Sequence, residues 1–148
     1  MTNELNQAIN ELIPKSLDDI IRDKRDECSL SLSTSDDLDE LPMIVDVAIK
    51  PKTIRAKLNN WRFVCVNNNG MKSHLLTGIH EAQNCVWSTS VIVGVDLEHG
   101  LALTRSGSIY KLGTKGEGEP ETDILLHICV QFHNWGIGEM LGVPHIFY

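Results

Sequence analysis

The stretch Val-Ile-Val-Gly-Val-Asp-Leu-Glu-His-Gly-Leu-Ala-Leu-Thr-Arg-Ser-Gly-Ser-Ile-Tyr-Lys-Leu, residues 91–112, decides the fold class. Three short runs rich in β-forming residues, at 91–95, 101–104 and 109–112, are separated by two turn segments that each carry a glycine. Short β-rich runs joined by glycine-bearing turns are typical of consecutive antiparallel strands. The stretch therefore predicts a three-stranded β-meander.

Further strand signals precede the meander. A partly alternating apolar run at 61–66 ends at the Asn-Asn-Asn-Gly segment 67–70, which is a strong hairpin-turn signal. Another β-rich run starts at Val86. Together with the meander, these runs predict an antiparallel sheet over residues 43–112.

The N-terminal segment has helical periodicity. Leu5, Ile9 and Leu12 recur at helical spacing. After Pro14, Ser16 is a favourable N-cap for a second helix. The apolar stripe expected for this second helix comprises Leu17, Ile20 and Ile21.

A C-terminal helix is predicted at about residues 121–135, after a loop at 113–120. The loop carries three glycines and no Gly-Lys-Ser/Thr ending, so we expect a flexible connection rather than a phosphate-binding loop. The stripe expected to be buried contains Ile124, Leu125, Ile128, Cys129 and Phe132. The face expected to meet water contains His127, Gln131 and Asn134.

Residues 29–42 are rich in serine and aspartate. This composition predicts a loop or linker between the N-terminal helices and the sheet. An alternative is an acidic segment that mimics nucleic acid or docks on a basic partner.

These elements predict a single α+β domain over residues 1–148, with helices at both ends packed on a small antiparallel β-meander sheet. Its parts are a helical segment at 1–28, the connector at 29–42, the sheet at 43–112, and a C-terminal helix and tail at 121–148.

Composition points to an ordinary globular protein, because 42% of the residues are hydrophobic and 22% are charged. No apolar run approaches the roughly 20 residues that span a bilayer, and the N-terminus does not resemble a secretory signal. We therefore expect a cytoplasmic protein without membrane contact. Its cysteines are widely spaced, which favours reduced thiols: Cys28, Cys65, Cys85 and Cys129.

The net charge of −7 conceals a strong asymmetry along the chain. Residues 1–49 carry a net charge of −8, residues 50–115 a net charge of +6, and residues 116–148 a net charge of −5. Such segregation suggests surfaces with separate electrostatic roles.

The basic stretch 50–62 is the strongest candidate contact surface. It holds five basic residues in thirteen, no acidic residue, and one tryptophan. Such a stretch is suited to an acidic protein surface, or to phosphates with the tryptophan stacked on a base. The plain alternatives are a solvated loop and helix turn without a partner, and a patch neutralised by the protein's own acidic N-terminal half. The candidate contact residues are Lys50, Lys52, Arg55, Lys57, Trp61 and Arg62.

Two chemical alternatives come from cysteine and histidine. A Cys–His nucleophile would pair Cys65 or Cys85 with His74 or His80. A zinc site would use Cys129 and His133, one helical turn apart, with His80 and Cys85 completing the ligand set. Buried packing roles are the more common explanation for the same residues.

No catalytic or cofactor motif dominates, so the sequence favours a small interaction protein that acts by surface complementarity, as an inhibitor, immunity or accessory factor. Another protein is the expected partner, with either the acidic N-terminal helices or the basic 50–62 stretch as the contact surface. No cofactor or metal is expected. The alternatives are a nucleic-acid-associated protein that uses the 50–62 stretch, and a Cys/His hydrolase or metal enzyme.

Overall fold

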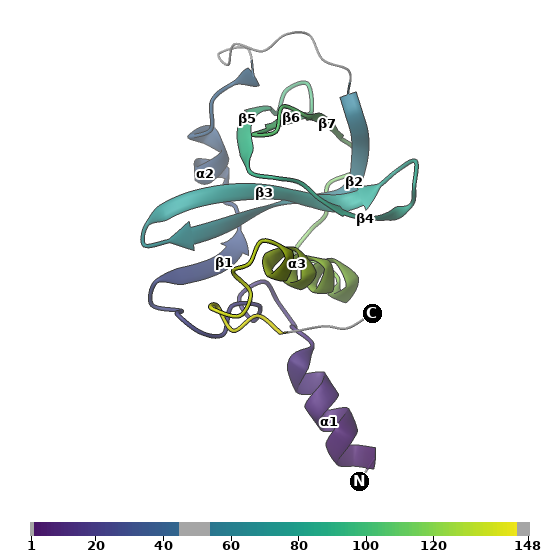
Figure 1. The fold of residues 1–148 in the computed structure, drawn as a ribbon. Coiled ribbons are helices and arrows are strands. Elements are labelled where there is room, and N and C mark those ends of the chain that lie inside the picture. Colours follow the sequence, from purple (N-terminus) through teal and green to yellow (C-terminus); the bar gives the residue numbers. More distant parts are fainter. Residues whose placement is uncertain (1, 45–53, 145–148) are drawn as a thin grey trace.

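The structure, a computed structural model, describes residues 2–44 and 54–144. In chain order, its elements are α1 (Thr2–Leu12), β1 (Cys28–Leu32), α2 (Ser35–Asp39), β2 (Ile54–Asn68), β3 (Met71–His80), β4 (Cys85–Ser88), β5 (Ile92–Asp96), β6 (Leu101–Thr104), β7 (Ile109–Leu112) and α3 (Thr122–Asn134). A sheet of seven strands forms the body, and α3 packs beside it (Figure 1). The predicted α+β class is confirmed.

The predicted turn at 67–70 and the antiparallel pairing expected within 91–112 are present, so the meander description is confirmed in part. Strand β6 pairs antiparallel with both β5 and β7. Strands β2 and β3 form a long hairpin, and its turn residues Asn69 and Gly70 have φ angles of +53° and +86°. Asparagine and glycine tolerate this left-handed backbone best, which is why the 67–70 segment marks the turn.

The sheet is larger than predicted and is mixed rather than purely antiparallel. Its order is β4-β3-β2-β7-β6-β5, with β1 also paired to β2, and the β2–β7 pair is parallel. Strand β2 changes partners along its length, because its first half pairs with β7 and its second half with β1. An irregularity between Asn59 and Arg62, where Asn60 has a φ angle of +52°, separates the two halves.

The segment 29–42, predicted as a connector, contains regular structure. Strand β1 pairs with β2, and Leu30 is buried in the core. Helix α2 begins with a capping box, in which Thr34 and Asp37 each accept the other's backbone N–H. The alternation Ser-Leu-Ser-Leu and the Thr34/Asp37 spacing therefore outweigh the loop-like composition.

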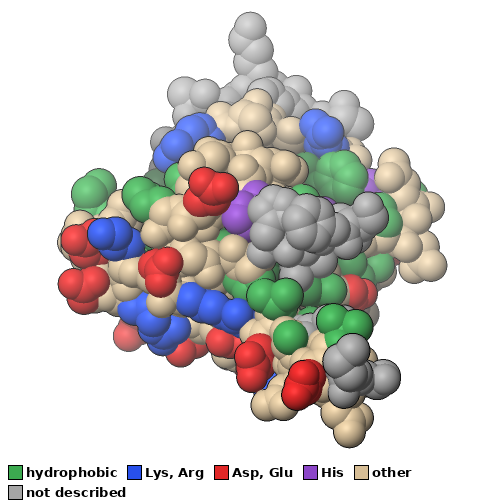
Figure 2. Space-filling model, turned by 60° about the horizontal axis from the view of Figure 1, so that its bottom comes forward, with side chains coloured by type: hydrophobic (Ala, Val, Ile, Leu, Met, Phe, Trp, Pro, Cys, Tyr) green, Lys and Arg blue, Asp and Glu red, His purple; other side chains and the backbone are tan. Residues whose placement is uncertain are grey.

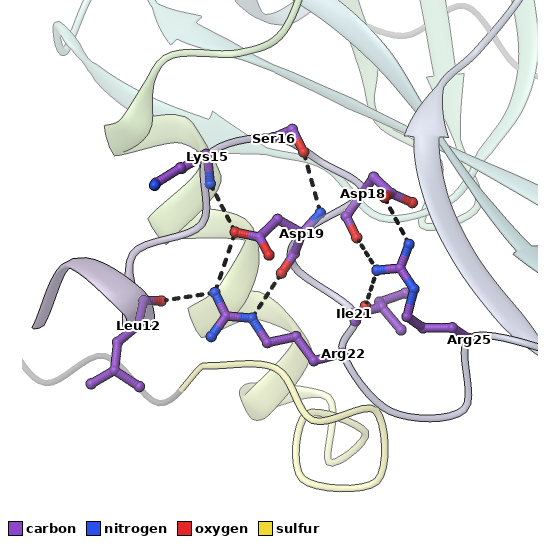
Figure 3. A network of polar contacts seen from close by, with 8 residues as sticks. All are labelled: Leu12, Lys15, Ser16, Asp18, Asp19, Ile21, Arg22 and Arg25. Carbon is purple, nitrogen blue, oxygen red and sulfur yellow. Dashed lines mark hydrogen bonds and ion pairs between the residues drawn. The ribbon is translucent and has the colours of Figure 1, made fainter. Parts of the chain in front are cut away.

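The second N-terminal helix is absent from the described residues, and turns replace it. The side chain of Arg25 donates to the carbonyls of Asp18 and Ile21, and the side chain of Arg22 donates to the carbonyl of Asp19 (Figure 3). The backbone N–H of Arg22 donates to Leu141 in the C-terminal segment. Carbonyls that a helix would use internally are thus satisfied by arginine side chains.

Helix α1 forms as predicted but does not pack on the sheet. It projects away from the body (Figure 1), and its side chains Leu5 and Leu12 are 62% and 47% exposed. The expectation that both N-terminal helices cover the sheet is therefore wrong.

Helix α3 buries the stripe predicted for it against the sheet. Its buried residues join a core cluster that includes Leu17, Leu30, Val64 and Leu75. A second cluster, with Phe63 and Leu76, holds side chains from the meander strands. The water-facing prediction is wrong for two of three residues, because His127 and Gln131 are half-buried and Gln131 donates to the carbonyl of Thr89, whereas Asn134 is exposed.

Charges on the face from which α1 projects are interspersed. Figure 2 shows basic and acidic side chains there as neighbours rather than in separate patches. Two ion pairs from the acidic N-terminal segment explain part of this pattern, Arg22–Asp19 at 3.3 Å and Arg25–Asp18 at 2.7 Å. The separation of acidic and basic segments along the sequence therefore does not produce separate charged patches on this face.

Candidate functional site

The predicted contact residues fall into three situations. Lys50 and Lys52 lie outside the described residues. Arg55 and Lys57 are exposed on β2, where Arg55 lies 5.9 Å from the centre of the Trp87 ring and Lys57 pairs with Glu81 at 3.3 Å. Trp61 is half-buried and Arg62 is buried. The structure therefore does not bring the basic side chains of 54–62 together on one free surface.

The side chain of Arg62 is buried and bonds to groups of the protein itself. Only 5% exposed, it donates to the carbonyls of Gly118 at 2.8 Å and Glu117 at 2.9 Å, and it pairs with Glu121 at 3.3 Å. Hydrogen bonds from the backbone N–H of Glu121 and from Asn60, with the charge of Arg62, lower the pKa of the Glu121 carboxyl. Arg62 therefore fastens the segment 113–121 to β2.

Backbone contacts complete this attachment. The N–H of Trp61 donates to the carbonyl of Thr114 at 3.1 Å, and the N–H of Gly116 donates to the carbonyl of Trp61 at 2.9 Å. A Cβ atom at Gly116 would lie 2.7 Å from the guanidinium carbon of Arg62, so glycine permits the close approach. The loop predicted to be flexible is thus tied to β2 at several points.

A groove of about 830 Å³ opens between this segment, α2 and the turn that joins β5 to β6. We call it the Trp61 groove. Its apolar lining comes from four regions of the chain: Leu32, Leu38, Trp61, Phe63, Leu97 and Leu112. Its volume lies within the roughly 300–1,000 Å³ typical of ligand sites.

The indole of Trp61 is held in place within the groove. Its Nε1 donates to the carbonyl of Gly113 at 3.0 Å, and its ring meets Phe63 edge-on with centroids 5.6 Å apart. The ammonium of Lys115 lies 5.9 Å from the ring centroid. An aromatic side chain fixed in this way is a rigid, preformed contact surface.

A partly buried polar cluster, with His74 and Asp37 buried, holds α2, the opposite wall of the groove. Ser33, which lines the groove, lies with its Oγ 2.7 Å from Nδ1 of His74. Burial lowers the pKa of His74. Asp37 pairs with Lys72 of β3 at 2.9 Å. Hydrogen bonds from the backbone of Thr34 and from Lys72 lower the pKa of Asp37 to about 2.

The sequence offered the acidic segment 29–42 as an alternative docking segment, but it was not expected to contain the helix α2. The signals that it offers are the alternation in β1 and the capping-box spacing of Thr34 and Asp37.

The two Cys–His pairs considered from the sequence are direct neighbours across strands. Cys65 lies opposite His74, and Cys85 lies opposite His80. Burial raises the pKa of the Cys65 thiol, and the Nδ1 atom of His74 faces Ser33. Nδ1 of His80 accepts the backbone N–H of Gln83. Nδ1 of His74 and Nδ1 of His80 are therefore each already bonded to a group other than a thiol.

The residues considered for zinc do not converge in the described part of the chain. Cys129 lies in the core, where burial raises its pKa to about 12, and Nε2 of His133 lies 2.9 Å from the carbonyl of Val143. Among residues 2–44 and 54–144, no three histidine, cysteine, aspartate or glutamate side chains are placed to share a metal ion.

Comparisons of the chain with protein-family models, with curated proteins and with solved structures found no match. Within the described residues, none of the helices has the length and apolar character needed to cross a membrane.

Proposed function

We propose that this protein is an interaction protein, acting as an inhibitor, immunity or accessory factor, and that the Trp61 groove receives a segment of a partner protein. The groove itself carries the proposal: an open hollow of about 830 Å³ that combines an apolar lining with a fixed tryptophan. Tryptophan is among the residues that contribute most to protein–protein binding.

Preorganised walls support a binding role. Arg62 holds the 113–121 wall, and the Asp37–Lys72 pair holds the α2 wall. A site whose walls are fixed before binding avoids much of the entropy loss of ordering them afterwards. The groove therefore suits recognition of a short segment that docks into an existing shape.

The proposal retains Trp61 from the predicted contact residues and changes the roles of its neighbours. Arg62 supports the groove wall instead of meeting a partner, because it is buried and bonded within the chain. Lys57 is paired with Glu81 outside the groove lining.

A capture experiment with matched variants tests the proposal. The full chain, a Leu97→Asp variant and a Met71→Asp variant serve as baits in lysate of the source organism, each with and without nuclease. Leu97 lines the groove and is 45% exposed, whereas Met71 is 79% exposed at the β2–β3 turn and does not line the groove. Both changes place a carboxylate on an exposed position, so neither should unfold the protein.

We expect one protein to be recovered in near-stoichiometric amount by the full chain and by Met71→Asp, and to be lost with Leu97→Asp. Equal recovery by all three baits, or no recovery by the unaltered chain, contradicts the proposal. Recovery that disappears with nuclease supports the nucleic-acid alternative instead.

A further inference from the structure

The acidic side chains of the Trp61 groove have no bonding partner among the described residues. Asp39 of α2, Glu98 of the β5–β6 turn and Glu117 of the 113–121 segment all line the groove and are exposed. Among the described residues, none of the three carboxylates makes an ion pair or a side-chain hydrogen bond. Each of the three walls thus presents one carboxylate with no partner in the described chain.

The cations of the groove, in contrast, already have partners within the protein. Arg62 is bonded to two carbonyls and to Glu121. The ammonium of Lys111 donates to the carbonyl of His99 at 2.9 Å. The ammonium of Lys115 lies over the Trp61 ring. A carbonyl or an aromatic ring leaves the charge of an ammonium in place, so Lys111 and Lys115 offset two of the three carboxylates. Apart from the Arg62–Glu121 pair, the groove lining therefore keeps a small net negative charge.

Helix α2 extends this negative character beyond the groove. Asp36 and Glu40 are exposed beside Asp39, and no ion pair among the described residues involves either of them. Asp36 lies in the first turn of α2 and Glu40 is its C-cap, so both are within about one helical turn of Asp39. They create a common negative field at this wall.

Resting on the proposed function, we infer that the partner segment is cationic: an apolar anchor residue, flanked by lysine or arginine, that enters the Trp61 groove. The anchor contacts Trp61, Phe63 and Leu97. The flanking cations pair with Asp39, Glu98 and Glu117, so these carboxylates are no longer unpaired in the complex. An arginine of the partner can also replace Lys115 over the Trp61 ring.

Selection from a displayed library of random 12-residue peptides tests this inference without a known partner. The immobilised full chain is the target, and selected peptides are counter-screened against Leu97→Asp. We expect peptides whose binding is lost with Leu97→Asp to share an aromatic or aliphatic residue with at least one lysine or arginine nearby.

Charge-reversal variants then measure the electrostatic contribution. Glu98→Lys combined with Glu117→Lys is compared with Asp26→Lys combined with Glu27→Lys. The second pair makes the same charge change at exposed residues that do not line the groove. We expect the groove pair to weaken a selected peptide by about 10-fold or more at 0.1 M salt, and the control pair to change affinity less than about 3-fold.

The outcomes separate the two proposals. The cationic partner is overturned if the peptides whose binding depends on Leu97 are neutral or acidic. It is also overturned if their affinity is unchanged by Glu98→Lys combined with Glu117→Lys. Either result leaves the groove function intact. Absence of any peptide that depends on Leu97 overturns both proposals.

Discussion

The ammonium of Lys72 lies 2.9 Å from Oδ1 of Asp37, so one ion pair joins the first turn of α2 to strand β3. The second oxygen of Asp37 accepts the backbone N–H of Thr34 at 2.9 Å. A helix of five residues is far too short to be stable alone, because isolated helices need about 12–15 residues. The position of one groove wall therefore depends on this carboxylate.

Replacement of Asp37 by asparagine should destabilise the protein at neutral pH and not at low pH. The folded pKa of Asp37, about 2, lies below its ordinary value of 3.8. Its stabilisation is therefore complete above about pH 4 and is lost as the pH falls toward 2. We expect Asp37→Asn to lower the free energy of unfolding by about 1–2 kcal/mol at pH 7. Urea titrations across this pH range measure the effect.

The matched control for this prediction is Asp36→Asn, which changes the exposed neighbour in the same helix. A loss of the same size at pH 7 and at pH 2.5 would show that Asp37 acts without its charge.

Arg62→Ala should release the 113–121 segment. The change leaves the carbonyls of Glu117 and Gly118 without their donor, and we expect a loss of about 2 kcal/mol in unfolding free energy. Hydrogen exchange at the Gly116 amide, which bonds to Trp61, should accelerate more than exchange in α3. Arg55→Ala, an exposed arginine on the same strand, is the control. Equal effects of the two variants would refute the role of Arg62.

His74 should make the protein less stable under mildly acidic conditions. Burial lowers its pKa below the ordinary value of 6.5, and the charge of Asp37 opposes this shift only in part. The unfolded chain therefore binds the proton first, and stability is lost as the pH falls below 6.5.

His74→Gln should flatten the slope of stability against pH between about pH 7.5 and pH 5.5, measured by urea unfolding. His127 contributes in the same direction, because burial lowers its pKa as well, so His127→Gln should remove a separate part of the slope. A slope that both single variants leave unchanged would contradict this prediction.

Cys85 should be the most reactive of the four thiols in the folded protein. It is exposed, whereas Cys28, Cys65 and Cys129 are buried, and burial raises the pKa of each buried thiol. Mass spectrometry after brief alkylation at pH 8 should find one modified cysteine, and Cys85→Ser should show almost none. Urea should expose the remaining thiols. Rapid native labelling of Cys129 would be inconsistent with its place in the core.

Local patterns predicted the elements whose signal lies within a few residues. The turn at Asn69 and Gly70 needs a left-handed backbone, and the α3 stripe from Ile124 to Phe132 repeats at helical spacing. The segment 29–42 was misassigned because its serine and aspartate content outweighed the alternation in β1. The second N-terminal helix was misassigned because periodicity does not reveal that Arg22 and Arg25 occupy its carbonyls.

The candidate site was only partly predictable. Trp61 was a candidate contact residue in the sequence, and its contact role stays a prediction. The role of Arg62 depends on the carbonyl of Gly118, which is 56 residues away, and the groove needs walls from α2, the β5–β6 turn and the 113–121 segment. Contacts over such separations follow from the parallel β2–β7 pairing, which no local pattern specifies.

The attachment of Arg62 to the 113–121 segment also has a consequence during synthesis. Trp61 and Arg62 are synthesised early, but the segment 113–121 that closes the groove around them follows about fifty residues later in the chain. A nascent chain that has released β2 and β3 but not residue 121 therefore has the hairpin without the groove. Non-local contacts of this kind slow folding. Under the proposed function, a partner segment therefore finds its groove only in chains synthesised beyond residue 121.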